Sequence, residues 1–448
     1  MNTPTQRKFG LLTTVAMIAG IVVGSGIFFK TDDILQAVNG NIQLGVLGWI
    51  LGAVGIIFGG LTIASYAKVE DNVGGIITYS EMAWGKTLGY LAGWFQIIFY
   101  YPALVAIISW VAASYMLVLF NQPGPFSTGE FTLFSWVLTV FLLIFFFIVN
   151  TLATKQAGKF QSFAFIAKIS ALLVLAIGGL TLGAPTFSST TISTGGGGLF
   201  VALISIAFAY DGWLVAPSIA HEIKHPKRNL PLALTFSPLL ILVVYVSYFL
   251  GLNALLGPEK ILELGNGAVG EAATLLFGPI GPRVVFTFVV ISVLGTLNGL
   301  ILGYIRLPYA LAVRDEIIAS QWLKQVSKKY QTPVYASVFA LIISFGWLIL
   351  HFISTLENSI LTGLSIDNLP IVLTYFFYIL LYVKVLIGNK DASTFFKKDK
   401  LFALFAIFGA LIVIIGGFLA ENAARYILVS LIGIGAGLLI RGKKRDLI

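Results

Sequence analysis

Long apolar runs that contain almost no charge are the feature that most limits how this chain can fold. The first run extends from about Leu11 to Phe29, with no charged residue between Lys8 and Lys30. A helix of this length can cross the ~30 Å hydrocarbon core of a bilayer. Only 10% of the 448 residues are charged, whereas soluble domains have about 25%. We therefore predict an all-α polytopic membrane protein, because helices pair their own backbone polar groups within lipid.

Twelve apolar segments are predicted to span the membrane. Their approximate bounds are 11–29, 42–66, 88–120, 131–152, 160–182, 199–220, 233–256, 284–311, 334–353, 360–386, 401–419 and 426–440. With the N-terminus inside, 22 of the 28 Lys and Arg residues fall in inner loops and four in outer loops. Since cytoplasmic loops are rich in Lys and Arg, both termini are predicted to be cytoplasmic. The same bias explains the net charge of +9, so we expect no nucleic-acid partner.

Two of these segments are interrupted by glycine. The first contains Gly24-Ser25-Gly26, and Gly-Ser pairs are common places for a helix to break. The sixth contains Phe208-Ala209-Tyr210-Asp211-Gly212-Trp213, in which a glycine follows an acid. Interrupted segments at corresponding places in two halves of a chain indicate a transporter's binding site. We predict that the two interruptions face each other near mid-membrane and bind a small zwitterion.

The two interruptions offer complementary backbone groups. After Gly24-Ser25-Gly26, the free amides at the start of the second half-helix suit a carboxylate. The alternative is a small-residue packing motif that includes Gly20 and Gly24. Around Gly212, the free carbonyls at the end of a half-helix suit an ammonium group. Together these groups would hold both ends of an amino acid.

Five side chains within the apolar segments need an explanation of their own. Asp211 would either pair with the substrate's ammonium group or, as we favour, cap the broken backbone. Phe208 and Trp213 are either gates over the ligand or ordinary packing. Lys168 lies deep in its segment and is either a fixed brace for the first helix or a proton carrier. Arg306 is predicted to extend toward the inner membrane surface.

Residue types that carry other chemistry are scarce. The chain has no cysteine, and its three histidines, His221, His225 and His351, do not form a metal-binding pattern. We find neither the ring of like groups that a channel needs nor the paired nucleophile and base of an intramembrane enzyme. We therefore expect no enzymatic activity, no metal and no cofactor.

The two motifs resemble those of a known family. Gly24-Ser25-Gly26-Ile27-Phe28 is similar to the G-S-G-I-F signature of the amino acid–polyamine–organocation (APC) superfamily. The run from Phe208 to Trp213, followed by residues 222–231, resembles the F-A-Y-D-G-W … E-x-K-N-P-x-R-x-L-P run of its L-amino-acid transporter (LAT) branch. Lys168 falls where that branch has a helix-5 lysine. The resemblance spans the whole chain and is greatest to bacterial serine/threonine and alanine-serine-cysteine exchangers.

The resemblance implies a LeuT-like fold in one transporter domain. Its inverted repeats of five helices would cover about 10–183 and 197–387, followed by two helices within 401–440. It implies sodium-independent exchange of small neutral L-amino acids across the plasma membrane by alternating access. Proton-coupled symport stays open as the alternative. The implied substrate-binding residues are Val22, Gly24, Ser25, Gly26, Ile27, Phe208, Ala209, Asp211, Gly212 and Trp213, with Lys168 in the place of a sodium ion.

The chain also departs from the human-type members of that branch. Those relatives often have an asparagine after the tryptophan, whereas this chain has Leu214. They also carry an outer-loop cysteine that links a partner glycoprotein. Without any cysteine such a disulfide cannot form, so we expect this chain to work alone in the lipid bilayer.

Overall fold

The computed structural model describes residues 10–69, 75–184, 198–213, 223–356, 359, 361–362, 366, 368–388, 397–419 and 423–445. The regular secondary structure in these residues is entirely helical. The helices are α1 (Leu11–Val22), α2 (Ser25–Phe29), α3 (Thr31–Ala37), α4 (Ile42–Val69), α5 (Ile76–Trp84), α6 (Lys86–Phe95), η1 (Gln96–Tyr100), α7 (Tyr101–Leu119), α8 (Leu133–Leu152), α9 (Thr154–Leu182), α10 (Leu199–Ala209), α12 (Pro226–Leu264), η3 (Gly265–Gly267), α13 (Ala268–Phe277), η4 (Gly278–Ile280), α14 (Gly281–Tyr304), α15 (Arg306–Val313), α16 (Ser320–Leu323), α17 (Val334–Thr355), α18 (Asn368–Ile387), α19 (Lys397–Leu419) and α20 (Ala423–Arg445).

Each predicted apolar segment contains a helix among the residues that the structure describes, and eight helical stretches there are long and apolar enough to cross a membrane. One boundary was predicted wrongly. The segment predicted for 360–386 begins later, because α18 starts at Asn368 with Pro370 in its first turn, where proline is favoured. The segment predicted for 284–311 is covered by α14 and α15. Ile305 between them keeps helical φ and ψ of −52° and −30°, and only the hydrogen bonding is irregular, because Pro308 lacks the amide that would bond to Tyr304.

The third apolar segment forms one run of 34 residues, Lys86–Leu119, with a π-helical turn inside it. In this turn the Tyr101 amide bonds to the Gln96 carbonyl oxygen, and the next residue, Pro102, has no amide. The carbonyls of Ile97 and Ile98 therefore lack their usual α-helical donors. The Tyr304 hydroxyl donates to the Ile97 carbonyl oxygen at 2.6 Å, and Trp347 Nε1 donates to that of Ile98 at 2.6 Å. Side chains of α14 and α17 therefore compensate for the irregular turn.

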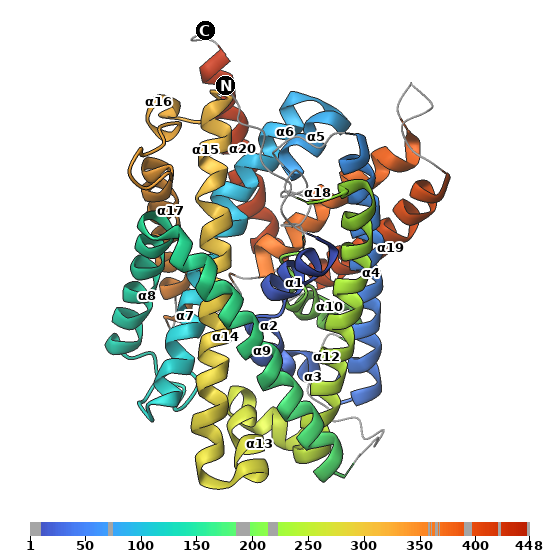
Figure 1. The fold of residues 1–448 in the computed structure, drawn as a ribbon, viewed down its shortest axis with the longest axis vertical. Helices are drawn as coiled ribbons and strands as arrows, with labels where there is room; N and C mark the ends of the chain where they lie inside the picture. The colour runs from blue at the N-terminus through green and yellow to red at the C-terminus, as the bar shows by residue number, and fades with distance from the viewer. Residues whose placement is uncertain are drawn as a thin grey trace.

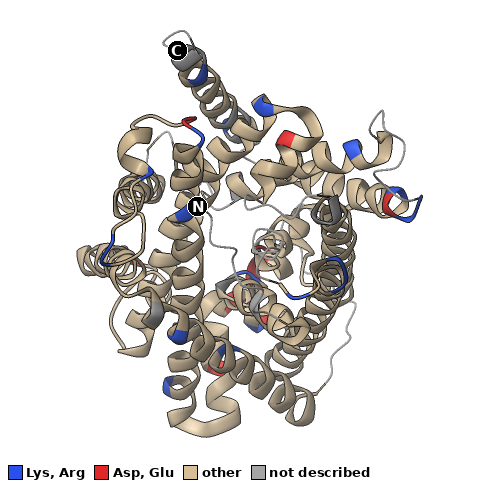
Figure 2. Cartoon of the chain, turned by 45° about the horizontal axis from the view of Figure 1, so that its top comes forward, with Lys and Arg blue, Asp and Glu red and all other residues tan. Residues whose placement is uncertain are grey.

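The short helices α1 and α10 lie inside the bundle rather than at its edge (Figure 1). Helix α1 contacts α9, α12 and α14, while α10 contacts α2, α3, α4, α18 and α19. At one end of the bundle lie α5, α15 and α16, which we call the α15 end, and at the opposite end lies α13, which we call the α13 end. Figure 2 shows that most of the helical ribbon carries neither basic nor acidic residues. This distribution is that of a multi-pass membrane protein.

Helices α9 and α12 pack through facing glycines. A Cβ atom on Gly179 would lie 2.2 Å from the carbonyl oxygen of Gly251, and one on Gly251 would lie 2.8 Å from that of Ala176. Small residues at such contacts allow two backbones to approach closely. These two long helices flank α1, so their spacing fixes the space available to it.

We expect Gly179→Ala to lower the thermal stability of the purified protein, by about 1–3 kcal/mol for an overpacked contact. The added methyl group meets backbone, which cannot rotate away. Gly158→Ala is the matched control on the same helix, because nothing lies within 4 Å of its Cβ position. A melting temperature in detergent that is the same for both variants would contradict this close packing.

Candidate functional site

The first predicted interruption is confirmed. Helix α1 ends at Val22, and Val23 is extended, with φ −69° and ψ 97°. Gly24 has φ −139° and ψ −141°, and α2 begins at Ser25. A Cβ atom on Gly24 would lie 2.3 Å from Oγ1 of Thr296, so α14 contacts the chain at the break.

The second interruption is also confirmed as far as the structure describes it. Helix α10 ends at Ala209, and residues 210–213 form a turn. Gly212 has φ +103°, a conformation that favours glycine, and a Cβ atom there would lie 2.7 Å from Cγ2 of Ile21. The remainder of the predicted segment, including Leu214, lies outside the described residues.

The two interruptions lie against each other, as predicted. A Cβ atom on Gly26 would lie 2.5 Å from Cα of Ala209, so only glycine allows this approach of backbone to backbone. The hydroxyl of Tyr245, on α12, is 3.2 Å from the carbonyl oxygen of Val22 and 3.1 Å from that of Ala209. It is a donor to the last carbonyls of both half-helices. Tyr245 therefore joins the ends of α1 and α10.

Lys168 projects from α9 toward the end of α1. Its Nζ donates to the carbonyl oxygen of Gly20 at 2.9 Å and to Thr296 Oγ1 at 3.4 Å, and the residue is fully buried. It makes no ion pair with any residue that the structure describes. The contact with Gly20 fits a brace for the first helix, while the lack of an acidic partner keeps proton transfer open.

Asp211 is held by a tyrosine. Its carboxylate accepts a hydrogen bond from the hydroxyl of Tyr100, the last residue of the π-helical turn. The bond ties the second interruption to the other irregular backbone of the bundle. It satisfies one carboxylate oxygen, as a bracing role requires.

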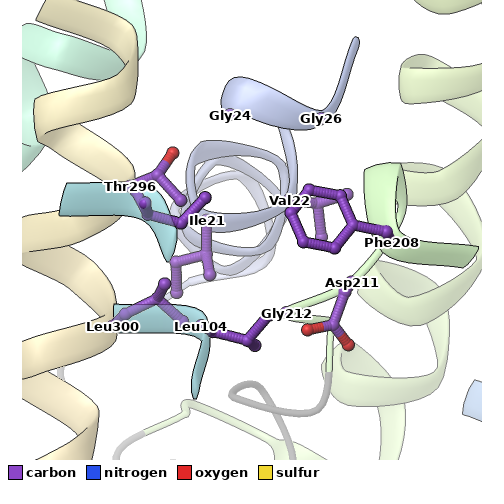
Figure 3. Close-up of a pocket in the computed structure, with 11 residues that line it drawn as sticks. Ile21, Val22, Gly24, Gly26, Leu104, Phe208, Asp211, Gly212, Thr296 and Leu300 are labelled. Atoms are coloured by element: carbon purple, nitrogen blue, oxygen red, sulfur yellow. The ribbon is translucent and has the colours of Figure 1, made fainter. Parts of the chain in front are cut away.

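A cavity lies between the two interruptions (Figure 3). Gly24 and Gly26 lie on one side of it, and Phe208 and Asp211 on the other. The space open to the centres of water molecules is about 30 Å³, which is room for about two waters. An amino acid would fit only if a lining side chain moved. The lining residues are Ile21, Val22, Gly24, Gly26, Leu104, Ile108, Phe208, Asp211, Gly212, Thr296 and Leu300.

Six of the predicted substrate-binding residues line this cavity: Val22, Gly24, Gly26, Phe208, Asp211 and Gly212. Ile27 and Ala209 are buried in the adjoining helix ends without lining it. Trp213 does not line it and packs edge-on against Tyr378, with 5.5 Å between ring centroids, a contact that fits the packing alternative. The structure describes the backbone of Ser25, but its side chain lies outside the described part.

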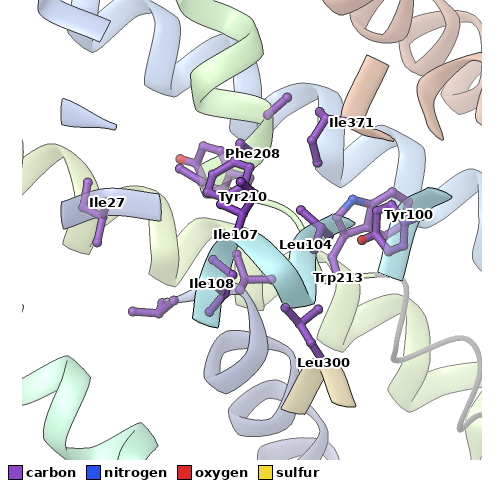
Figure 4. Packing of buried hydrophobic residues seen from close by; sticks show 14 of the residues in the cluster. Ile27, Tyr100, Leu104, Ile107, Ile108, Phe208, Tyr210, Trp213, Leu300 and Ile371 are labelled. Carbon is purple, nitrogen blue, oxygen red and sulfur yellow. The ribbon is translucent and has the colours of Figure 1, made fainter. Parts of the chain in front are cut away.

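Sequence reasoning missed the apolar wall of the cavity. Leu104 and Ile108 reach it from α7, and Leu300 reaches it from α14 (Figure 4). These helices are apolar on most faces, so no periodic pattern shows which face turns inward. Tyr245 was missed for the same reason.

Lys30 was also missed, because it was counted with the outer loops. The residue is only 4% exposed, and its Nζ lies 5.5 Å from the centroid of the Phe208 ring and 2.9 Å from Oδ2 of Asp33. A buried ammonium group over an aromatic face stabilises that ring position by about 2 kcal/mol. Lys30, at the start of α3, thereby stabilises the position of the Phe208 ring that lines the cavity.

Comparison with known proteins identifies relatives along most of the chain. The model of the family described as "Amino acid permease" matches residues 9–436. The chain is 29% identical over 389 residues to the serine/threonine exchanger SteT of Bacillus subtilis, covering 87% of this chain and 84% of that protein. It is 26% identical over 436 residues to the b(0,+)-type amino acid transporter 1 of Mus musculus, covering 95% and 85%. It is 26% identical over 343 residues to the human Asc-type amino acid transporter 1, covering 74% and 63%.

We expect Tyr245→Phe to reduce the free energy of unfolding by about 1–3 kcal/mol, because two buried carbonyls would lose their donor. Tyr248→Phe is the matched control one helical turn away. Tyr248 is equally buried, and its hydroxyl has no hydrogen-bond partner among the described residues. Denaturation of both variants in detergent checks this, and equal losses would show that the Tyr245 bonds contribute nothing.

Proposed function

We propose that this chain, which belongs to the amino acid permease family, exchanges small neutral L-amino acids across the plasma membrane by alternating access. One observation carries the proposal: two interrupted helices meet at a cavity inside the bundle, with Gly26 against Ala209. Backbone of this kind is tolerated at membrane depth where it lines a site. The serine/threonine exchanger SteT supports exchange as the mode of transport.

In the proposed complex, the substrate lies between the two half-helices. Its carboxylate meets the amides around Gly24, Ser25 and Gly26, where the dipole of the resumed helix favours negative charge. Its ammonium group meets carbonyls at the end of α10, between Phe208 and Asp211. The support for this orientation is that glycines from the first interruption and residues from the second line opposite sides of one cavity.

The preference for small neutral side chains follows from the cavity wall. Leu104, Ile108 and Leu300 are apolar, and among the described residues that line the cavity only Asp211 is charged. A charged substrate side chain would find no counter-ion there other than Asp211. The cavity holds only about two waters, so a lining side chain must move before an amino acid can enter. We assign this movement to the ring of Phe208, which lines the cavity.

Lys168 supports independence from sodium. Its ammonium group bonds to the Gly20 carbonyl oxygen near the end of α1. A bound sodium ion would contact carbonyl oxygens of the same kind, so the lysine would take its place. The second candidate function is proton-coupled symport. It is favoured by the same buried ammonium group, which has no acidic partner among the described residues and could release its proton.

The number of spans, the repeats and the orientation of the chain are also part of the proposal. We infer twelve spans, with inverted repeats over about 10–183 and 197–387, and a chain that works without a covalent partner. Lys86, Arg314 and Lys324 lie beside α5, α15 and α16 at the α15 end, so the rule that basic loops stay inside makes this the cytoplasmic end.

Exchange is tested with purified protein in proteoliposomes. We expect labelled serine or alanine to enter vesicles loaded with unlabelled amino acid much faster than empty vesicles. Uptake into empty vesicles that is driven by an inward proton gradient would instead establish symport. If neither internal amino acid nor the gradient stimulates uptake, both proposed modes are wrong.

Lys168→Ala separates the roles of the lysine. If Lys168 is a brace, its loss removes about 1.5–3 kcal/mol of support for the helix end, and exchange should fall about ten- to a hundredfold. If it carries protons, gradient-driven uptake disappears while exchange persists. Lys159→Ala is the control, because this exposed lysine lies on the same helix. Exchange and gradient responses that match wild type would remove Lys168 from the mechanism.

A further inference from the structure

A second and larger cavity lies apart from the proposed substrate site. It has a volume of about 560 Å³ and lies where α8 meets α9, where α14 meets α15, and where the chain approaches α17. The two cavities share no lining residue. Its polar wall includes Thr154, Gln156, Tyr330 and Gln331. Cavities of this size are typical of sites for small molecules.

Two positive charges face this cavity without a counter-ion. Arg306 and Lys329 both line it, and among the described residues no lining residue is acidic and neither basic residue makes an ion pair. The Lys329 ammonium group lies 5.1 Å from the centroid of the Tyr330 ring. Lys324, by contrast, pairs with Asp315 at 3.3 Å. The cavity therefore offers a net positive site to an anion.

The inner wall adds an acceptor that lacks a donor. Asn150 is 1% exposed, and its Nδ2 donates to the carbonyl oxygen of Phe146 at 2.9 Å and to Asn298 Oδ1 at 3.1 Å. Its Oδ1 is buried with no hydrogen-bond partner among the described residues. A buried polar atom of this kind usually has a partner. A ligand that carries a hydroxyl group next to its anionic group would supply one, directly or through water.

The cavity is continuous with an apolar face at the edge of the bundle. Leu152 lines the cavity and is 45% exposed, and Ile148 and Phe145 continue the same exposed face along α8. Figure 1 places α8 at the periphery, where it would meet lipid. Acyl chains can follow such a face while a headgroup occupies the polar cavity.

We propose that this cavity binds the phosphate group of an anionic phospholipid. Arg306 and Lys329 contact the phosphate, and the acyl chains lie along Phe145, Ile148 and Leu152. Basic pockets between membrane helices recognise anionic headgroups in this way. The proposal does not depend on the transport function, because it concerns a separate cavity.

The test measures lipid retained by the purified full-length protein, with native mass spectrometry after exposure to phosphatidylglycerol or to phosphatidylcholine. We expect phosphatidylglycerol to be retained preferentially. Arg306→Gln and Lys329→Gln should each weaken retention about fivefold, corresponding to about 1 kcal/mol for each basic residue near the surface. All three variant sites, including the control Lys328, are exposed, so the substitutions should leave folding intact, which melting curves check.

The control is Lys328→Gln, because Lys328 neighbours the cavity without lining it. A general attraction of basic surface to anionic lipid would respond equally to all three substitutions, and that result would overturn the site. A third arm uses inorganic phosphate as the competitor. If millimolar phosphate displaces the lipid and Leu152→Ser has no effect on retention, the site belongs to a soluble phosphate and the lipid assignment is wrong.

Discussion

Peptide groups that have lost their helical partners inside the bundle are the constraint on which this structure depends. Each such group costs free energy unless another donor reaches it. The carbonyls of Gly20, Val22 and Ala209 at the helix interruptions receive bonds from Lys168 and Tyr245. The carbonyls of Ile97 and Ile98, left without donors by the π-helical turn and Pro102, receive theirs from Tyr304 and Trp347. These donors come from four surrounding helices, α9, α12, α14 and α17, so the frame of the bundle is organised to support its irregular backbone.

The interruptions themselves could be predicted because their causes are local. Gly24-Ser25-Gly26 weakens a helix wherever it occurs, and Asp211-Gly212 permits a backbone conformation that closes a turn. The apolar segments could be located because a span has a minimum length and excludes charge. The length and charge limits on a span locate most long helices, and the two glycine interruptions indicate which helices are broken and meet. The family resemblance added the substrate-binding residues, and six of them line one cavity.

The remainder depends on how helices rotate against each other, which the sequence does not reveal. Leu104 and Leu300 face the cavity, although nothing distinguishes them from leucines that face lipid. Lys30 was assigned to an outer loop, but it lies just before α3 with its ammonium group buried over the Phe208 ring. The late start of α18 at Asn368 was missed because an apolar run does not show where within it a helix begins. For Leu104, Leu300 and Lys30 the deciding contact is made by a segment far away in the sequence.

The bond made by Tyr245 has a consequence for motion. A phenol has one hydrogen, and here two oxygen atoms, at 3.2 and 3.1 Å, compete for it. The two acceptor oxygens lie at nearly equal distances from the hydroxyl. Rotation about the C–O bond therefore redirects the hydrogen bond from one half-helix to the other at little energetic cost. The hydroxyl can therefore stay bonded to one half-helix while the end of the other half-helix shifts a short distance away from α12. A rigid pair of separate donors would resist that displacement.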